Sequence, residues 1–265
     1  MYETTYHKAG SVAEAASLMA SADDGKILGG GQTLLPTMKQ RLAAPSDLVD
    51  VTKIADMSGI SANGDGVTIG AATTHFEVSS SDLVKQKLPG LASLAGGIGD
   101  PAVRHMGTIG GSIANNDPAA DYPAALVALG ATVVTSKREL AAEEFFTGMF
   151  ETALDEDEIV VAVRFPGAAA SAYAKYPNPA SRYAMAGVFV AKGSDGSVKV
   201  AVTGAGQGGV FRMSAMETAL AGNFSPDAVA GIAPDADDLL SDIHGSAAYR
   251  ANLVTVMAKR AVQKA

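Results

Sequence analysis

The sequence contains no cysteine, and this absence excludes several kinds of site. Without thiols the chain cannot form a disulfide, bind zinc through thiolates, or ligate an iron–sulfur cluster with its own side chains. The four histidines (His7, His75, His105 and His244) include no pair at the spacing of metal ligands. No G-x-S-x-G segment is present, so a hydrolase of the nucleophile-elbow type is unsupported. We therefore expect neither a metal site nor a catalytic side chain.

Positive charge is also scarce, with 20 lysines and arginines against 28 aspartates and glutamates and a net charge of −8. No basic cluster offsets this acidic total, which argues against a nucleic-acid surface. The longest uncharged segment, Tyr122 to Ser136, is shorter than the roughly 18–20 residues that a membrane span requires. The first residues show no basic segment followed by an apolar run, so no signal peptide is expected. These features predict a cytoplasmic protein that binds no nucleic acid and does not span a membrane.

The chain has 265 residues, of which 48% are hydrophobic and 18% charged, enough for a globular fold of two or three subdomains. In residues 1–55, Ser11 and Glu14 form a capping-box pattern that predicts a helix. Short strands are expected at Lys26–Gly29 and Leu48–Val51, with Thr33 capping a helix between them. This order predicts a compact parallel α/β unit.

Residues 56–167 show a mixed pattern, in which Thr74 and Glu77 form a second capping box. Strands are expected at Val67–Ala71, Ala131–Thr135 and Ile159–Phe165, and helices within Leu83–Gly97 and at Tyr122–Leu129. The small-residue segment Gly167–Ser171 predicts a domain boundary. After it we expect strands at Ala172–Tyr176, Ala184–Lys192 and Val198–Gly204 and helices at Ser214–Ala221 and Ser246–Val262.

The first glycine-rich segment, Gly29-Gly30-Gly31-Gln32-Thr33, follows an apolar strand and opens a helix. Glycines lack a Cβ, so the backbone can approach a ligand closely and direct its N–H groups at a phosphate. A tight turn without a ligand is the alternative interpretation of this segment. It matches neither the G-x-G-x-x-G fingerprint nor the P-loop, because the Lys-Ser/Thr pair is missing.

The second glycine-rich segment runs from Met106 to Pro118 and contains Thr108-Ile109-Gly110-Gly111-Ser112, which we interpret as a loop. Two such segments in one chain suggest that a dinucleotide is held between them by its pyrophosphate. Asp121 follows shortly afterwards and could accept hydrogen bonds from sugar hydroxyls. The alternative role of Asp121 is to cap the helix that begins at Tyr122.

Both segments resemble the flavin motifs of a known family. Gly29–Pro36 with Met38-Lys39 is similar to the first motif, and Thr108–Ala114 with its continuation to Asp121 is similar to the second. The family comprises the FAD-binding medium subunits of molybdenum hydroxylases similar to aerobic carbon monoxide dehydrogenase, together with the flavin domain of xanthine dehydrogenase. The resemblance extends over the whole chain.

The resemblance implies an α+β fold with three parts. An N-terminal α/β subdomain (residues 1–55) and a middle subdomain with a mixed or antiparallel sheet (56–167) would bind FAD between them. A C-terminal domain (168–265) would contain a three-stranded antiparallel sheet and helices.

The same resemblance assigns the residues of the cofactor site. The backbone of residues 29–33 and 108–112 would contact the pyrophosphate, and Asp121 would bind sugar or ribitol hydroxyls. Tyr183 would lie near the isoalloxazine ring, although a core tyrosine at a strand start is the alternative. The assigned residues are Leu28, Gly29, Gly30, Gly31, Gln32, Thr33, Leu34, Thr108, Ile109, Gly110, Gly111, Ser112, Asp121, Val160, Lys175 and Tyr183. Many relatives carry Asn where Ser112 stands, so one side-chain contact of those relatives is not expected here. No His or Cys is placed for covalent attachment, so FAD is expected to be non-covalent.

The function implied is electron transfer within a complex. FAD on this chain would receive electrons from a small [2Fe–2S] subunit, which a large molybdenum-cofactor subunit supplies, and would pass them to an external acceptor. The complex would be a heterotrimer or a dimer of heterotrimers. The alternatives are the same subunit serving an aldehyde or N-heterocycle dehydrogenase, a non-redox assembly protein with this fold, and a free-standing flavin oxidase.

Overall fold

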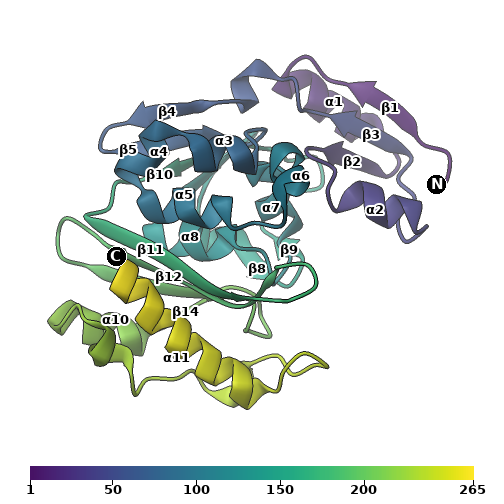
Figure 1. Ribbon diagram of the computed structural model, residues 1–265. Coiled ribbons are helices and arrows are strands. Elements are labelled where there is room, and N and C mark those ends of the chain that lie inside the picture. Colours follow the sequence, from purple (N-terminus) through teal and green to yellow (C-terminus); the bar gives the residue numbers. More distant parts are fainter.

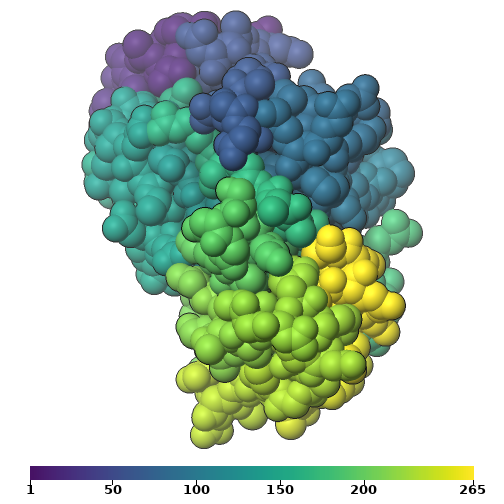
Figure 2. Space-filling model, turned by 90° about the vertical axis from the view of Figure 1, so that its left-hand side faces the viewer, coloured from purple at the N-terminus to yellow at the C-terminus, as the bar shows by residue number.

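The computed structural model describes all 265 residues, and it confirms the expected mixed helix-and-strand fold (Figure 1). Three main sheets follow one another along the chain, and each lies within one of the ranges 1–55, 56–167 and 168–265. We call these ranges the N-terminal, middle and C-terminal regions; their use as domain boundaries stays a prediction. The N-terminal region lies at one end of the molecule and the C-terminal region at the other (Figures 1 and 2).

The N-terminal region is a three-stranded parallel sheet with the strand order β1-β3-β2. Its elements are β1 (Thr5–Lys8), α1 (Val12–Ser21), β2 (Gly25–Leu28), α2 (Leu34–Lys39) and β3 (Asp47–Asp50). Strand β1 was not predicted, because its side chains are largely exposed and show no apolar alternation. The Ser11 hydroxyl caps α1 as expected, whereas the Glu14 carboxylate accepts from the Gly10 N–H.

The prediction that the Thr33 side chain caps the second helix is wrong. Thr33 occupies the N-cap position of α2, but its side chain makes no capping hydrogen bond. The start of this helix is therefore left without the side-chain acceptor that usually satisfies its first N–H groups.

The middle region is built on a five-stranded antiparallel sheet with the order β4-β5-β10-β6-β7. Its strands are β4 (Ile60–Asn63), β5 (Gly66–Gly70), β6 (Thr132–Thr135), β7 (Glu139–Ala141) and β10 (Val160–Phe165), with a small hairpin of β8 (Phe146–Gly148) and β9 (Glu151–Thr152). Its helices are η1 (Ala55–Met57), α3 (His75–Ser80), α4 (Asp82–Lys87), α5 (Pro89–Gly96), α6 (Pro101–Met106), α7 (Ile109–Asn115), α8 (Tyr122–Leu129) and α9 (Ala142–Phe145).

The C-terminal region contains the expected antiparallel sheet, extended by a short fourth strand in the order β11-β12-β13-β14. Its elements are β11 (Ala170–Pro177), β12 (Ala184–Lys192), β13 (Val198–Thr203), β14 (Phe211–Arg212), α10 (Ser214–Gly222), η2 (Pro226–Val229), η3 (Ala236–Asp238) and α11 (Ala247–Lys264). Helix α11 runs along one face of β11 and β12 (Figure 1). No helix of the structure combines the length and the apolar character that crossing a bilayer would demand.

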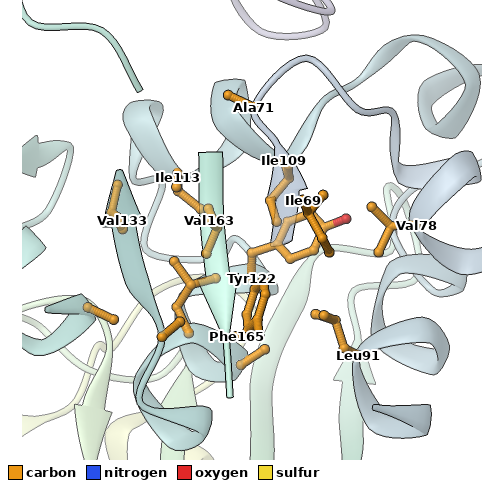
Figure 3. Close-up of a cluster of buried hydrophobic side chains, with 14 of the residues drawn as sticks. Ile69, Ala71, Val78, Leu91, Ile109, Ile113, Tyr122, Val133, Val163 and Phe165 are labelled. Carbon is orange, nitrogen blue, oxygen red and sulfur yellow. The ribbon is translucent and has the colours of Figure 1, made fainter. Parts of the chain in front are cut away.

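Helix α8 connects the two larger regions. All eight of its residues are buried, and it packs against α5, α7 and α9 on one side and against β12 and β13 on the other. Tyr122, at its start, lies among Ile109, Phe165 and Leu91 in the larger core cluster (Figure 3). The core of the middle region therefore continues into the C-terminal sheet.

The capping box at Thr74 forms as predicted and sets the start of α3. The Thr74 hydroxyl accepts from the Glu77 N–H at 3.2 Å, and the Glu77 carboxylate accepts from the Thr74 N–H at 2.7 Å. This reciprocal pair satisfies two N–H groups that a helix start otherwise leaves without partners.

The substitution Thr74→Ala should lower the free energy of unfolding by about 1 kcal/mol, because the capping oxygen is lost. Thr74→Ser keeps that oxygen and serves as the matched control, with a stability close to wild type. Urea unfolding of the three proteins measures the difference. Equal stability of the alanine and serine variants would contradict the capping role.

Candidate functional site

The two glycine-rich segments meet at one cavity of about 810 Å³. It is bordered by residues from the N-terminal, middle and C-terminal regions. Fourteen of the sixteen predicted site residues border this cavity: Leu28, Gly29, Gly30, Gly31, Gln32, Thr33, Leu34, Thr108, Gly110, Gly111, Ser112, Asp121, Val160 and Tyr183. Ile109 and Lys175 do not border it. The volume lies within the range of about 300–1,000 Å³ typical of ligand and cofactor sites.

The first glycine segment borders the cavity and carries free main-chain N–H groups. It joins the end of β2 to the start of α2, and the N–H groups of residues 29–34 donate no hydrogen bond within the chain. Gly31 has a φ of +68°, a left-handed conformation that glycine adopts without strain. Because these donors lie beside a cavity, the segment forms a concave site suited to an anion.

Glycine at position 30 allows the two segments to touch. A Cβ on Gly30 would lie 2.6 Å from the Cα of Gly107 and would overlap the carbonyl oxygen of Met106. Similarly, a Cβ on Gly29 would lie 3.0 Å from the Thr108 hydroxyl oxygen. The backbones of the two segments therefore form one continuous wall of the cavity.

The second glycine segment is not the loop that the sequence suggested, because Ile109–Asn115 forms helix α7. The Thr108 hydroxyl caps this helix by accepting from the Gly111 N–H at 3.2 Å. The N–H of Ile109 donates to Thr73, that of Gly110 to Ala71, and that of Ser112 to the Thr108 carbonyl.

The N–H groups of residues 109–112 are therefore used within the chain, whereas the N–H of Thr108 donates no hydrogen bond. The expected backbone contact of residues 108–112 with a pyrophosphate stays a prediction. The glycines of this segment serve packing: a Cβ on Gly110 would lie 2.5 Å from the Cβ of Ala71. The Ile109 side chain is fully buried in the core cluster (Figure 3) and does not border the cavity.

Asp121 is held by two residues of strand β11. Its carboxylate is 5% exposed and accepts from the Tyr173 hydroxyl at 2.5 Å and from the Lys175 ammonium at 3.0 Å. It makes no capping hydrogen bond at the start of α8, so the helix-cap alternative does not hold. Burial raises the pKa of Asp121, and the neighbouring ammonium and hydroxyl oppose that rise. Lys175 reaches the site through Asp121 and does not itself border the cavity.

Tyr183 and Val160 border the cavity from two further elements. Val160 begins β10 and is buried, whereas Tyr183 precedes β12 and is only partly buried. The Asn178 amide donates to the Tyr183 hydroxyl at 2.9 Å, which fixes the ring at the edge of the cavity. The ring also packs against the core cluster of the C-terminal region, so both interpretations of Tyr183 stay open.

His75 borders the cavity and was not among the predicted site residues. It is 5% exposed, its Nδ1 has no hydrogen-bond partner, and its ring lies 5.4 Å from that of Tyr122. Burial, and secondarily the charge of Arg104, lowers its pKa to about 4, so the imidazole is neutral at pH 7. In the sequence, the capping-box pattern around Thr74 indicated only that a helix starts near His75, and nothing marked His75 as a cavity residue.

Glu158 is a second cavity residue that the sequence did not single out. Its side chain is fully buried and accepts from the Arg138 guanidinium at 3.0 and 2.9 Å and from the Thr135 hydroxyl at 2.6 Å. The hydrogen bonds from Arg138 lower the pKa of Glu158 to about 2. The charge is satisfied within the chain, which indicates a structural role in the cavity wall.

Comparison with known proteins identifies the family. Residues 2–168 match the model of the FAD binding domain in molybdopterin dehydrogenase. The chain is 35% identical to the carbon monoxide dehydrogenase medium chain of Hydrogenophaga pseudoflava, covering 98% of this chain and 96% of that protein. It is 33% identical to the glyceraldehyde dehydrogenase medium chain of Sulfolobus acidocaldarius, covering 99% and 98%. In structure it is similar to reconstituted CO dehydrogenase from Oligotropha carboxidovorans, with a TM-score of 0.90 at 34% identity and coverage of 99% and 97%.

The chain belongs to the family of FAD-binding domains of molybdopterin dehydrogenases. It is a subunit of an oxidoreductase, and FAD is its cofactor.

The ion pair of Glu158 predicts a specific dependence of stability on pH. Because its pKa lies below the ordinary 4.5, the carboxylate stabilises the folded state fully above about pH 4.5 and loses this contribution as the pH falls to about 2. Glu158→Gln should lower the free energy of unfolding at pH 7 by about 2 kcal/mol and flatten its decline below pH 4.5. Urea unfolding across this pH range tests it, and parallel curves for the two proteins would contradict it.

Proposed function

We propose that this chain is the FAD-carrying electron-transfer subunit of a molybdenum hydroxylase similar to carbon monoxide dehydrogenase. The observation that carries the proposal is the row of free N–H groups at residues 29–34 beside an 810 Å³ cavity. A neutral substrate would not need such a row, whereas the pyrophosphate of a dinucleotide supplies the anionic oxygens that it fits.

The residues of the cavity fit FAD in distinct ways. The N–H groups of residues 29–34 hold the pyrophosphate, and the Met106–Gly107 backbone at the end of α6 supports them through its contact with Gly30. Asp121 retains lone pairs that can accept from ribose or ribitol hydroxyls, and Tyr183 lies at the cavity edge where a flavin ring can pack. The chain has no cysteine for attachment, and the proposal is that FAD is held without a covalent bond.

The absence of cysteine also defines the partners that this proposal needs. FAD, when bound, accepts electrons singly and passes them on in pairs. The chain cannot hold an iron–sulfur donor, so the [2Fe–2S] clusters belong to a small subunit and the molybdenum cofactor to a large one. Relatives named as medium chains of dehydrogenases support this arrangement. A heterotrimer or a dimer of heterotrimers, an external electron acceptor and a cytoplasmic location remain parts of the proposal.

A second candidate substrate is an aldehyde, since a glyceraldehyde dehydrogenase medium chain matches nearly as well as the carbon monoxide dehydrogenase one. An N-heterocycle is favoured in the same way by the nicotine 6-hydroxylase medium subunit of Paenarthrobacter nicotinovorans, at 34% identity. The cavity described here belongs to the cofactor, so this choice lies with the large subunit.

The substitution Gly31→Ala tests the free N–H groups as the anion site. An alanine there is strained at φ +68° and its Cβ would lie 2.8 Å from Leu35, so the N–H groups would reorient. We expect FAD affinity to fall about tenfold or more, measured by flavin fluorescence titration of the full chain.

Gly64→Ala is the matched control, because Gly64 has a φ of +58°, no atom lies within 4 Å of its added Cβ, and it does not border the cavity. It carries a similar backbone strain and should bind FAD as wild type does. If the Gly31 variant also retained full affinity, the first segment would not be the pyrophosphate site.

The purified wild-type chain, loaded with FAD, should show a flavin absorption spectrum and no turnover of carbon monoxide, aldehydes or N-heterocycles. The reason is that the proposal places substrate oxidation on the large subunit, and the chain holds no group of His, Asp or Glu residues that could bind a metal. Oxygen consumption during substrate oxidation by this chain alone would indicate a free-standing oxidase instead. A colourless protein that takes up no FAD would favour the assembly-protein alternative.

A further inference from the structure

The cavity wall that carries Asp121 is attached to the C-terminal sheet. The Thr203 hydroxyl, at the end of β13, lies 2.6 Å from the Ala120 carbonyl oxygen and 3.1 Å from that of Pro118. The N–H of Gly204 donates to the Pro118 carbonyl at 2.8 Å. The segment that leads into Asp121 is therefore held by a strand that lies some 80 residues further along the chain.

Both side-chain partners of Asp121 also come from this sheet. Tyr173 and Lys175 stand two residues apart on β11, so they share one face of the strand, and each takes one oxygen of the carboxylate. No side chain of the middle region donates to that carboxylate. Its position relative to the cavity is thus determined by residues outside the segment matched by the FAD-binding family model.

The Tyr173 hydroxyl packs against a glycine of the neighbouring strand. Gly187 of β12 pairs with Lys175, and a Cβ on Gly187 would overlap the Tyr173 hydroxyl oxygen. Tyr173 is 6% exposed, and burial beside Asp121 raises its pKa well above the ordinary value, so the hydroxyl keeps its proton and donates it. A phenylalanine would fill the same ring space and lack only this donor.

We propose that Tyr173 is a positioning residue of the flavin site, which acts through Asp121 and fixes the carboxylate so that its remaining lone pairs meet the cofactor's hydroxyls. This inference rests on the proposed function. The hydroxyl and the Lys175 ammonium together orient the buried carboxylate, and both favour its ionised form against the effect of burial. The C-terminal sheet thereby contributes to cofactor binding through a side chain that does not border the cavity.

The substitution Tyr173→Phe in the full chain should weaken FAD binding about tenfold, which is the loss expected for a hydrogen bond to a charged group. Fluorescence titration with FAD at pH 7 measures it. Because Tyr173 acts through Asp121, Asp121→Asn and the double variant should bind with similar affinity, so that the second substitution adds little to the first.

The pH dependence provides a readout that a purely structural tyrosine would not change. The groups that face the Asp121 carboxylate are Tyr173 and Lys175 on β11 and Tyr122 on α8. Loss of the Tyr173 hydroxyl raises the pKa of Asp121 further, so FAD affinity of Tyr173→Phe should begin to fall at a higher pH than that of wild type as acid is added. FAD affinity of Asp121→Asn should lack the fall that protonation of the Asp121 carboxylate causes.

Tyr176→Phe is the matched control on the same strand. Tyr176 also lies beside another tyrosine, Tyr249, but it packs against the core cluster on the opposite face of the sheet. It should bind FAD as wild type does. Thermal unfolding of the apo chains checks that Tyr173→Phe remains folded, which its unchanged ring volume favours.

The possible results separate the two proposals. A wild-type chain that binds no FAD refutes the proposed function and this inference with it. If the wild-type chain binds FAD and Tyr173→Phe binds it equally well, only the role of Tyr173 is overturned. The same holds if the losses of FAD binding free energy in Tyr173→Phe and Asp121→Asn simply add in the double variant.

Discussion

The close approach of the Gly30 backbone to the Met106–Gly107 backbone is the constraint on which the site depends. It closes the gap between the N-terminal sheet and the middle region, and it brings residues 29–34, whose N–H groups have no partner, to the border of the cavity. Any side chain at position 30 would separate these two backbones. The same contact explains how a short parallel sheet of three strands can serve as one wall of a binding site.

The two glycine motifs look alike in sequence but do different work. The first supplies unpaired donors, whereas the donors of the second are used to anchor α7 to Thr73 and Ala71. Small residues in the second motif let this helix lie directly on the end of β5. A glycine-rich pattern alone therefore does not distinguish ligand contact from close packing. The hydrogen-bond inventory of each N–H group does.

Much of the fold was predictable because short sequence patterns determine many of its helices and strands. The capping box at Thr74 and the apolar run of β12 gave correct elements, and fourteen of the sixteen residues assigned from the resemblance border the cavity. Strand β1 was missed because its side chains are exposed and its pairing depends on distant residues. The neutral state of His75 and the bond from Tyr173 to Asp121 were also beyond local reasoning, since both arise from burial between segments far apart in sequence.

Helix α8 has a consequence for the evolution and handling of this chain. Since each of its faces is covered, partly by β12 and β13, it belongs to the cores of two regions at once. A fragment that ended at residue 168, where the match to the family model stops, would expose one apolar flank of this helix to water. Such a fragment would tend to aggregate, so the middle and C-terminal regions need to be expressed together.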